Sequence, residues 1–211
     1  MISKSDIVEL HSIFFKKYGF ELNPCNSSFE KAFEGGKQVV AVYCFEGKEG
    51  IIVDYSFGIR IHAIEELVNQ HLPTLINNVE ESLTMDMPMG KLGNYRPGVI
   101  KISTALELDE LVDNIEKFFS LKGFSWLDQM SDPHILEQQY YCKKRKPNNP
   151  NEMVEIAFRS IALSKLFNPE NYPELRQAYL EKMDYREMTP LTIASFFHFL
   201  NYLDHLNPIA A

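Results

Sequence analysis

Residues 29–61 read FEKAFEGGKQVVAVYCFEGKEGIIVDYSFGIRI and predict three consecutive strands joined by short turns. The pair Gly35-Gly36 between the first two strands suits the positive backbone angles of a tight hairpin. Residues 39–45 are apolar at adjacent positions, which is typical of an interior strand covered on both faces. Residues 51–61 alternate between apolar and polar side chains, which is typical of a strand with one buried face. The stretch therefore predicts an antiparallel β-meander.

Helical periodicity lies on both sides of the meander. Residues 6–18 carry apolar side chains at helical spacing, with Ser5 as the expected N-cap and Gly19 as the expected exit. Thr104 with Glu107 forms the pattern of a capping box, which opens a helix that we expect to end at Gly123. Both helices end as Phe-Phe, three residues, then Gly-Phe. Since no second meander follows, we interpret this motif as shared cap chemistry and not as an internal repeat.

The last part of the chain has a helical pattern throughout. Thr189 followed by Pro190 is a helix-start signature, and it precedes a broad apolar arc. The sequence thus predicts an α+β fold, with an antiparallel β-meander packed on helices in residues 1–146 and an all-helical C-terminal extension, residues 147–211, packed on the first part. The helices expected in that extension cover residues 153–167, 173–183 and 190–206.

Residues 73–97 have the weakest pattern in the chain. We expect a helical turn over residues 74–82, before a run with methionine at alternate positions. That run is interpreted either as a poorly patterned edge strand or as an adaptable contact surface, because methionine repacks easily. The methionines are Met85, Met87 and Met89.

Composition limits the class of partner. A net charge of −8 opposes nucleic-acid phosphates, so we expect no nucleic-acid partner and interpret the basic run at 143–146 as a helix end. No stretch approaches the ~18 uninterrupted apolar residues of a membrane span, so we expect a soluble cytoplasmic protein without membrane contact. Widely spaced cysteines indicate reduced thiols, with Cys44 buried in a strand, rather than a disulfide framework or zinc site.

The second face of the third strand carries the strongest positional signal for a binding site. Alternation places Asp54, Ser56, Gly58 and Arg60 on this face, with His62 beyond them. Asp54 and Arg60 are about 20 Å apart in an extended strand, but Arg60 and His62 are about 7 Å apart. These two residues could bind an anionic group or a carboxylate of a partner. The alternative is a solvated sheet face or a structural charge contact.

The sequence predicts no catalytic residue, cofactor or metal site. His198 and His205 share a helical face without a carboxylate or thiol at ligand spacing, and His62 and His71 flank a short helix without an HExxH motif. The glycine-containing stretch 93–101 is followed by a predicted strand and not by a helix, so we interpret it as a turn and not as a phosphate loop. Whether the protein is an enzyme stays open, and the hypothesis favoured here is that it is not.

The order of these elements resembles uncharacterised bacterial α+β families, some of which are associated by gene neighbourhood with toxin immunity. The likeness covers about residues 6–140 and consists of apolar and glycine positions. It implies an interaction protein and transfers no catalytic residue. The residues that carry it are Gly19-Phe20, Phe29, the strand from Val53 to His62, Gly123-Phe124 and Trp126-Leu127.

Two functional hypotheses follow. The preferred one is a non-enzymatic cytoplasmic interaction protein of immunity type, which uses the polar sheet face or the methionine-rich loop to bind a protein partner. The alternative is a small-molecule-binding protein or enzyme with a pocket near Arg60 and His62. A secondary expectation is a homodimer through the helix at 190–206, because its apolar arc covers about 240°.

Overall fold

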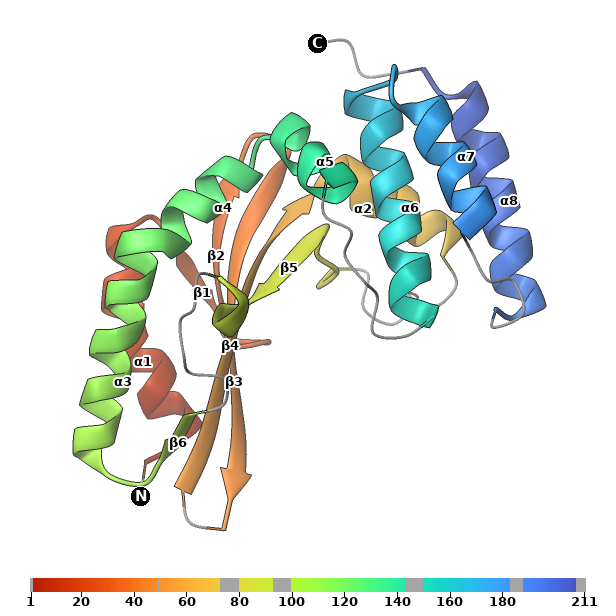
Figure 1. Ribbon diagram of the computed structural model, residues 1–211. Helices are drawn as coiled ribbons and strands as arrows, with labels where there is room; N and C mark the ends of the chain where they lie inside the picture. Colours follow the sequence, from red (N-terminus) through yellow and green to blue (C-terminus); the bar gives the residue numbers. More distant parts are fainter. Residues whose placement is uncertain are drawn as a thin grey trace. The chain divides into compact units, whose positions relative to one another are not determined.

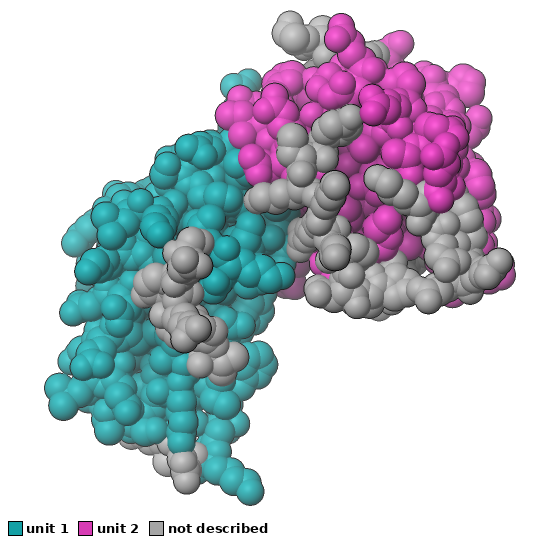
Figure 2. All heavy atoms as spheres, viewed as in Figure 1, with its two compact units in different colours: residues 1–60, 85–131 teal, residues 61–84, 132–211 magenta. Residues whose placement is uncertain are grey.

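The computed structural model describes residues 2–48, 50–72, 80–92, 100–142, 150–182 and 188–207. Its architecture is α+β, with an antiparallel sheet and helices concentrated toward the C-terminus, as the sequence predicts (Figure 1). The chain divides into two compact units, which are described separately (Figure 2). Unit 1 comprises residues 1–60 and 85–131, and unit 2 comprises residues 61–84 and 132–211.

The sheet belongs to unit 1 and, within the described residues, has six strands. Strands β1 to β4 lie side by side in chain order, and both β5 and β6 pair with the remaining edge of β4. β5 pairs with residues 56–59 of β4, and β6 pairs with residues 51–53. The predicted meander, β2-β3-β4, is confirmed. The strands are β1 (Glu21–Asn23), β2 (Ser28–Phe33), β3 (Gly36–Gly47), β4 (Gly50–Ile61), β5 (Met85–Pro88) and β6 (Ile100–Ile102).

Helices of unit 1 cover one face of the sheet. The alternating apolar residues of β4 point toward them: Tyr55 contacts His11 of α1, and the Phe57 ring contacts Phe119 and Trp126. This buried face confirms the alternation predicted for the third strand. The helical elements are α1 (Lys4–Lys17), η2 (Met89–Lys91), α3 (Ala105–Phe118), the π-helical turn η3 (Phe119–Gly123) and α4 (Phe124–Met130).

Helix α1 begins with a serine N-cap and ends at a glycine, as expected, but the capping serine is a different one. Ser3, and not Ser5, is the N-cap: its hydroxyl accepts a bond from the Asp6 N–H at 3.3 Å, and the Asp6 carboxylate accepts from the Ser3 N–H at 2.7 Å. This reciprocal capping box starts the helix earlier than predicted. Gly19, with φ +82°, ends the helix as expected, and the N–H of Phe20 bonds to the Phe15 carbonyl.

The expected stop at Gly123 is wrong. Gly123 has helical angles, φ −62° and ψ −48°, and the helix continues through a π-helical turn into α4. A Cβ at this position would lie 2.4 Å from the Phe119 ring. Glycine is therefore required here for close packing and not for a left-handed exit, so the two Gly-Phe motifs do not share cap chemistry.

The two motifs nevertheless meet in one aromatic cluster. Phe15 contacts Phe119 at 5.1 Å between ring centroids, and Phe14 stacks on Phe124 at 5.7 Å. Tyr18 also stacks on Phe124, at 4.2 Å. Aromatic pairs at these separations add stability beyond their buried area. The cluster joins the end of α1 to the bend between α3 and α4.

The methionine run forms an edge strand, which confirms one of the two interpretations. Met85 and Met89 are buried, and only Met87 is half-buried. The run therefore does not present three methionines as an adaptable surface. Most of the helical turn expected over 74–82, and the turn expected over 93–101, fall outside the described residues.

Unit 2 is a helical bundle around α6. This helix contacts α2, α5, α7 and α8, and the Phe158 ring of α6 stacks on Phe199 of α8 at 4.7 Å. Thr189 caps α8, with Pro190 at its first position, as predicted. The helices are α2 (His62–His71), α5 (Pro133–Cys142), α6 (Pro150–Phe167), α7 (Tyr172–Lys182) and α8 (Pro190–His205).

The division between the units differs from the predicted boundary at 146/147. Unit 2 begins its second segment at Asp132 and also contains residues 61–84. The reason is tertiary packing, because α2 leaves the sheet strand and packs on α6 and α8. In the part of the chain that the structure describes, no helix is both long and apolar enough to cross a membrane.

Candidate functional site

The residues predicted to form a site lie on two elements, Asp54, Ser56 and Arg60 on β4 and His62 at the start of α2. Arg60 is the penultimate residue of β4 and only 7% exposed, whereas His62 is exposed and begins α2. Strand alternation ends at Ile61, so the expectation that Arg60 and His62 project from one strand face does not hold. Asp54 and Ser56 remain on the outer face of β4, where both are half-buried.

Part of the outer sheet face forms a candidate contact surface, which we call the open face. The Ser56 hydroxyl donates to the Tyr43 Oη at 3.4 Å, so β3 and β4 present these side chains on one side. Ile52 lies directly opposite Lys101 in the ladder, on the same side. The open face consists of Tyr43 and Phe45 on β3, Ile52, Asp54 and Ser56 on β4, and Lys101 on β6.

Strand β3 was expected to be covered on both faces, and in its second half it is not. Tyr43 is 46% exposed and Phe45 is 58% exposed. The opposite face of the same strand is buried, with Val40 and Val42 both close to 0% exposed. The sequence of β3 is thus apolar on both faces, as in an interior strand, but the rings of Tyr43 and Phe45 are exposed to solvent on one of these faces.

Polar groups around the open face are oriented by local contacts. Asp54 accepts a hydrogen bond from the Tyr55 N–H at 2.8 Å, which holds its carboxylate beside the strand. Cys44 is half-buried, less than expected, and lies on the inner face. Burial raises the pKa of its thiol, and the nearby Lys4 charge opposes this only in part. The thiol therefore stays protonated at neutral pH and is a poor nucleophile.

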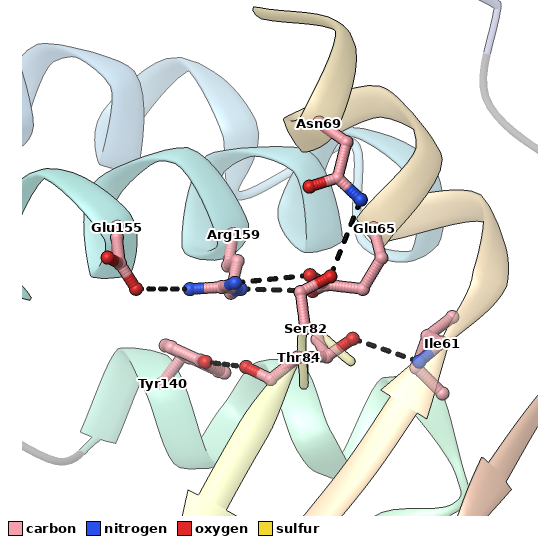
Figure 3. Close-up of polar contacts among 8 residues, drawn as sticks. All are labelled: Ile61, Glu65, Asn69, Ser82, Thr84, Tyr140, Glu155 and Arg159. Carbon is pink, nitrogen blue, oxygen red and sulfur yellow. Dashed lines mark hydrogen bonds and ion pairs between the residues drawn. The ribbon is translucent and has the colours of Figure 1, made fainter. Parts of the chain in front are cut away.

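A second polar cluster lies inside unit 2 (Figure 3). Arg159 of α6 forms a two-point ion pair with Glu65 of α2, with Nε donating to Oε1 at 2.9 Å and Nη2 donating to Oε2 at 3.1 Å. Its third nitrogen, Nη1, donates to Glu155 Oε2 at 3.0 Å. The Glu65 side chain is 0% exposed and that of Arg159 is 8% exposed. The three residues form a clamp between α2 and α6, in which Glu65 and Arg159 are buried and Glu155 is half-buried.

Neighbouring polar contacts attach the rest of segment 61–84 to the same bundle. The Tyr140 hydroxyl of α5 donates to the Thr84 carbonyl, and the Thr84 hydroxyl accepts from the Ile61 N–H at 2.9 Å (Figure 3). Asn69 donates to the Ser82 hydroxyl at 3.4 Å. These bonds hold both ends of the segment, so the cluster explains why it belongs to unit 2.

The clamp holds one cation between two carboxylates. Burial alone would disfavour the Arg159 cation, but the carboxylates of Glu65 and Glu155 outweigh it and raise the pKa of Arg159 above its usual value. A guanidinium held by two carboxylates has few donors left for a ligand. The clamp is therefore a structural element. Sequence reasoning missed it, although an arginine inside the apolar run AFRSIAL was a signal for a buried partner.

An open hollow of about 270 Å³ lies along the exposed side of α8, lined by His198, Asn201, Tyr202, His205 and Leu206. The His71 ring of α2 lies near it, 5.4 Å from that of His198. Neither Arg60 nor His62 lines this hollow. Among the described residues, no three His, Cys, Asp or Glu side chains are grouped so that they could hold a metal ion.

Helix α8 buries part of its apolar arc within unit 2. Phe196, Phe199, Leu200 and Leu203 are at most 1% exposed. On the polar strip, Asp204 accepts a hydrogen bond from the Tyr172 hydroxyl at 2.6 Å and pairs with Arg176 at 3.0 Å. Leu191, Phe197 and Tyr202 of the same helix remain 63%, 49% and 39% exposed, and the homodimer through residues 190–206 stays a prediction.

No family model matches the chain, and no solved structure matches it.

Proposed function

We propose that this protein is a non-enzymatic protein-binding module whose partner docks on the open face of the sheet. The observation that carries the proposal is the exposure of Tyr43 and Phe45, at 46% and 58%, on a strand whose sequence is that of an interior strand. Aromatic residues are enriched at the centres of protein interfaces, where they provide much of the binding energy. A partner would complete the second layer that β3 lacks.

The chemistry of the open face limits the kind of partner. Its centre is apolar, with Tyr43, Phe45 and Ile52, and it is flanked by one anion, Asp54, and one cation, Lys101. A complementary surface has an apolar centre and one charge of each sign at its rim. Such rim charges favour the correct orientation more than they increase affinity.

Binding is proposed rather than catalysis because the polar cluster around Arg159 already has a structural role. Glu65 and Glu155 are both bonded to Arg159, and the Tyr140 hydroxyl is bonded to the backbone. The resemblance to families associated with toxin immunity suggests a toxin as the partner class. The hollow on α8 is not lined by Arg60 or His62, so it adds nothing to the alternative of a pocket near these two residues.

Replacing both exposed aromatics is expected to abolish partner binding. The variant Tyr43→Thr/Phe45→Thr keeps residues that favour strands but removes both rings. Since interface hot spots contribute about 2 kcal/mol or more each, recovery of a specific partner should fall at least about tenfold. The measurement is affinity capture from the native host with tagged wild-type and variant chains, with quantification by mass spectrometry.

The matched control is Leu106→Ala/Leu121→Ala, which removes two apolar side chains that are 77% and 68% exposed on the helical side of unit 1. It should recover the same partner as the wild type. Equal recovery by all three chains, with thermal unfolding unchanged, would show that the open face is not the binding surface.

A further inference from the structure

The outer edge of β3 is open along its second half. β2 pairs with β3 only as far as Ala41, and the last bond on that side runs from the Val42 N–H to the Ser27 carbonyl at 3.2 Å. β3 continues to Gly47 with β4 on its other side. In the described part of the chain no strand pairs with the outer edge beyond Val42, and Figure 1 shows the β3–β4 hairpin continuing past β1 and β2.

The alternation of residues along the strand identifies the backbone groups on this edge. In an antiparallel ladder the N–H and C=O of one residue point to the same neighbouring strand, and successive residues alternate between the two neighbours. Since Val42 points toward β2, Cys44 and Glu46 point the same way. Their two N–H and two C=O groups therefore line the open edge.

This edge lacks the usual protection against pairing. Exposed edges are commonly blocked by proline, by a bulge or by a lysine in the strand. Residues 43–45 are Tyr-Cys-Phe, and the first charge is Glu46. The edge thus combines two exposed aromatic side chains, Tyr43 and Phe45, with unpaired backbone donors and acceptors, which is the condition for strand addition.

We propose that a second copy of this chain pairs with the edge, β3 against β3, in an antiparallel arrangement with a two-fold axis at Phe45. Cys44 of each copy then lies opposite Glu46 of the other, and all four open backbone groups of each copy are bonded. Phe45 lies opposite its own counterpart as a non-hydrogen-bonded pair, the position where cross-strand side chains are closest.

The neighbouring registers are disfavoured by charge and by bonds already made. An axis at Glu46 would set two carboxylates directly opposite each other, which is destabilising. An axis at Cys44 would set Glu46 opposite Val42, whose N–H is already bonded to Ser27. The register centred on Phe45 avoids both conflicts. Like charges do not face each other in it.

The substitution Glu46→Pro tests the edge contact without removing a hydrogen bond within the fold. The Glu46 N–H points to the open edge, so Glu46→Pro removes a bond to the second copy and none to β4. Proline is tolerated at such edge positions, and Phe45 before it is already extended. Glu46→Ala is the matched control, because it removes the same charge and keeps the N–H.

Sedimentation equilibrium tests the association with Phe45 intact. A short two-strand contact is smaller than the ~1,200 Å² of stable complexes, so the dimer should form reversibly as concentration rises to about 1 mM. The wild type and Glu46→Ala should gain mass with concentration, and Glu46→Pro should remain monomeric. A dimer that survives Glu46→Pro, for instance one through α8, would overturn the proposal.

Disulfide trapping tests the register. In a Cys25→Ser background, which removes an exposed thiol, Phe45→Cys should form a covalent dimer on mild oxidation. Tyr43→Cys should not form one, because position 43 of each copy lies opposite Gly47 of the other copy, so the two new thiols do not meet. Equal cross-linking of the two variants, or none with Phe45→Cys, would contradict the register.

A wild type that stays monomeric at every concentration in sedimentation equilibrium overturns the dimer. That result leaves the proposed function intact, since partner capture on the open face does not require the dimer.

Discussion

Replacing Arg159 by methionine is expected to lower the free energy of unfolding of unit 2 by about 3–5 kcal/mol. The Glu65 carboxylate has no exposed surface, and Arg159 supplies its two-point ion pair. Without the guanidinium, the Glu65 charge would remain buried without its partner. Methionine keeps the length and helix propensity of the side chain, so the loss reports mainly on the charge.

Urea unfolding followed by circular dichroism measures this loss, because most of the helix in the described residues belongs to unit 2. The single tryptophan, Trp126, lies in unit 1 and serves as an internal reference. Two further variants make the result specific. Glu155→Gln should cost at most about 1 kcal/mol because that side chain is 36% exposed, and Glu65→Leu/Arg159→Met should regain most of the stability because it removes both buried charges. If the double variant is as unstable as Arg159→Met, the buried charge is not the cause.

Acidification from pH 6.5 to pH 4 is expected to remove about 3 kcal/mol of the stability of unit 1 through His11 alone. His11 is fully buried, with its Nε2 2.7 Å from the Tyr55 hydroxyl oxygen. Burial lowers the pKa of His11 from 6.5 to about 4. The unfolded chain therefore binds a proton near pH 6.5 while the folded chain stays neutral. Stability is complete above pH 6.5, falls as the pH drops, and this loss is complete below pH 4.

The measurement is urea unfolding monitored by Trp126 fluorescence at a series of pH values, for the wild type and for His11→Gln. His11 is the only histidine of unit 1, so the remaining titration in that range comes from carboxylates that both proteins share. The difference between the two profiles should therefore change by about 3 kcal/mol between pH 6.5 and pH 4. Parallel profiles would mean that His11 becomes charged without cost.

Local patterns in the sequence predicted the elements whose causes are local. The alternation from Ile51 to Ile61 predicted β4 and its buried face, since strand periodicity depends only on neighbouring residues. Thr104 and Glu107 predicted the start of α3, and Thr189 with Pro190 that of α8, because a cap is completed within one turn.

Contacts between distant residues explain what was missed. The path of the chain at Gly123 depends on the position of the Phe119 ring, so the glycine alone indicated a stop that does not occur. Glu65 and Arg159 are 94 residues apart, and neither has a neighbour in the sequence that points to the other. The exposure of Phe45 depends on which elements cover β3, which its own apolar pattern does not specify.

The two-segment construction of unit 2 has a consequence for synthesis on the ribosome. Helix α2 is completed at His71, but the helices on which it packs, α6 and α8, begin at Pro150 and Pro190. At about 5–20 residues per second, the nascent α2 waits several seconds before α8 emerges. During that time the Glu65 carboxylate is still hydrated, and its desolvation becomes one of the last steps in the maturation of the newly made chain.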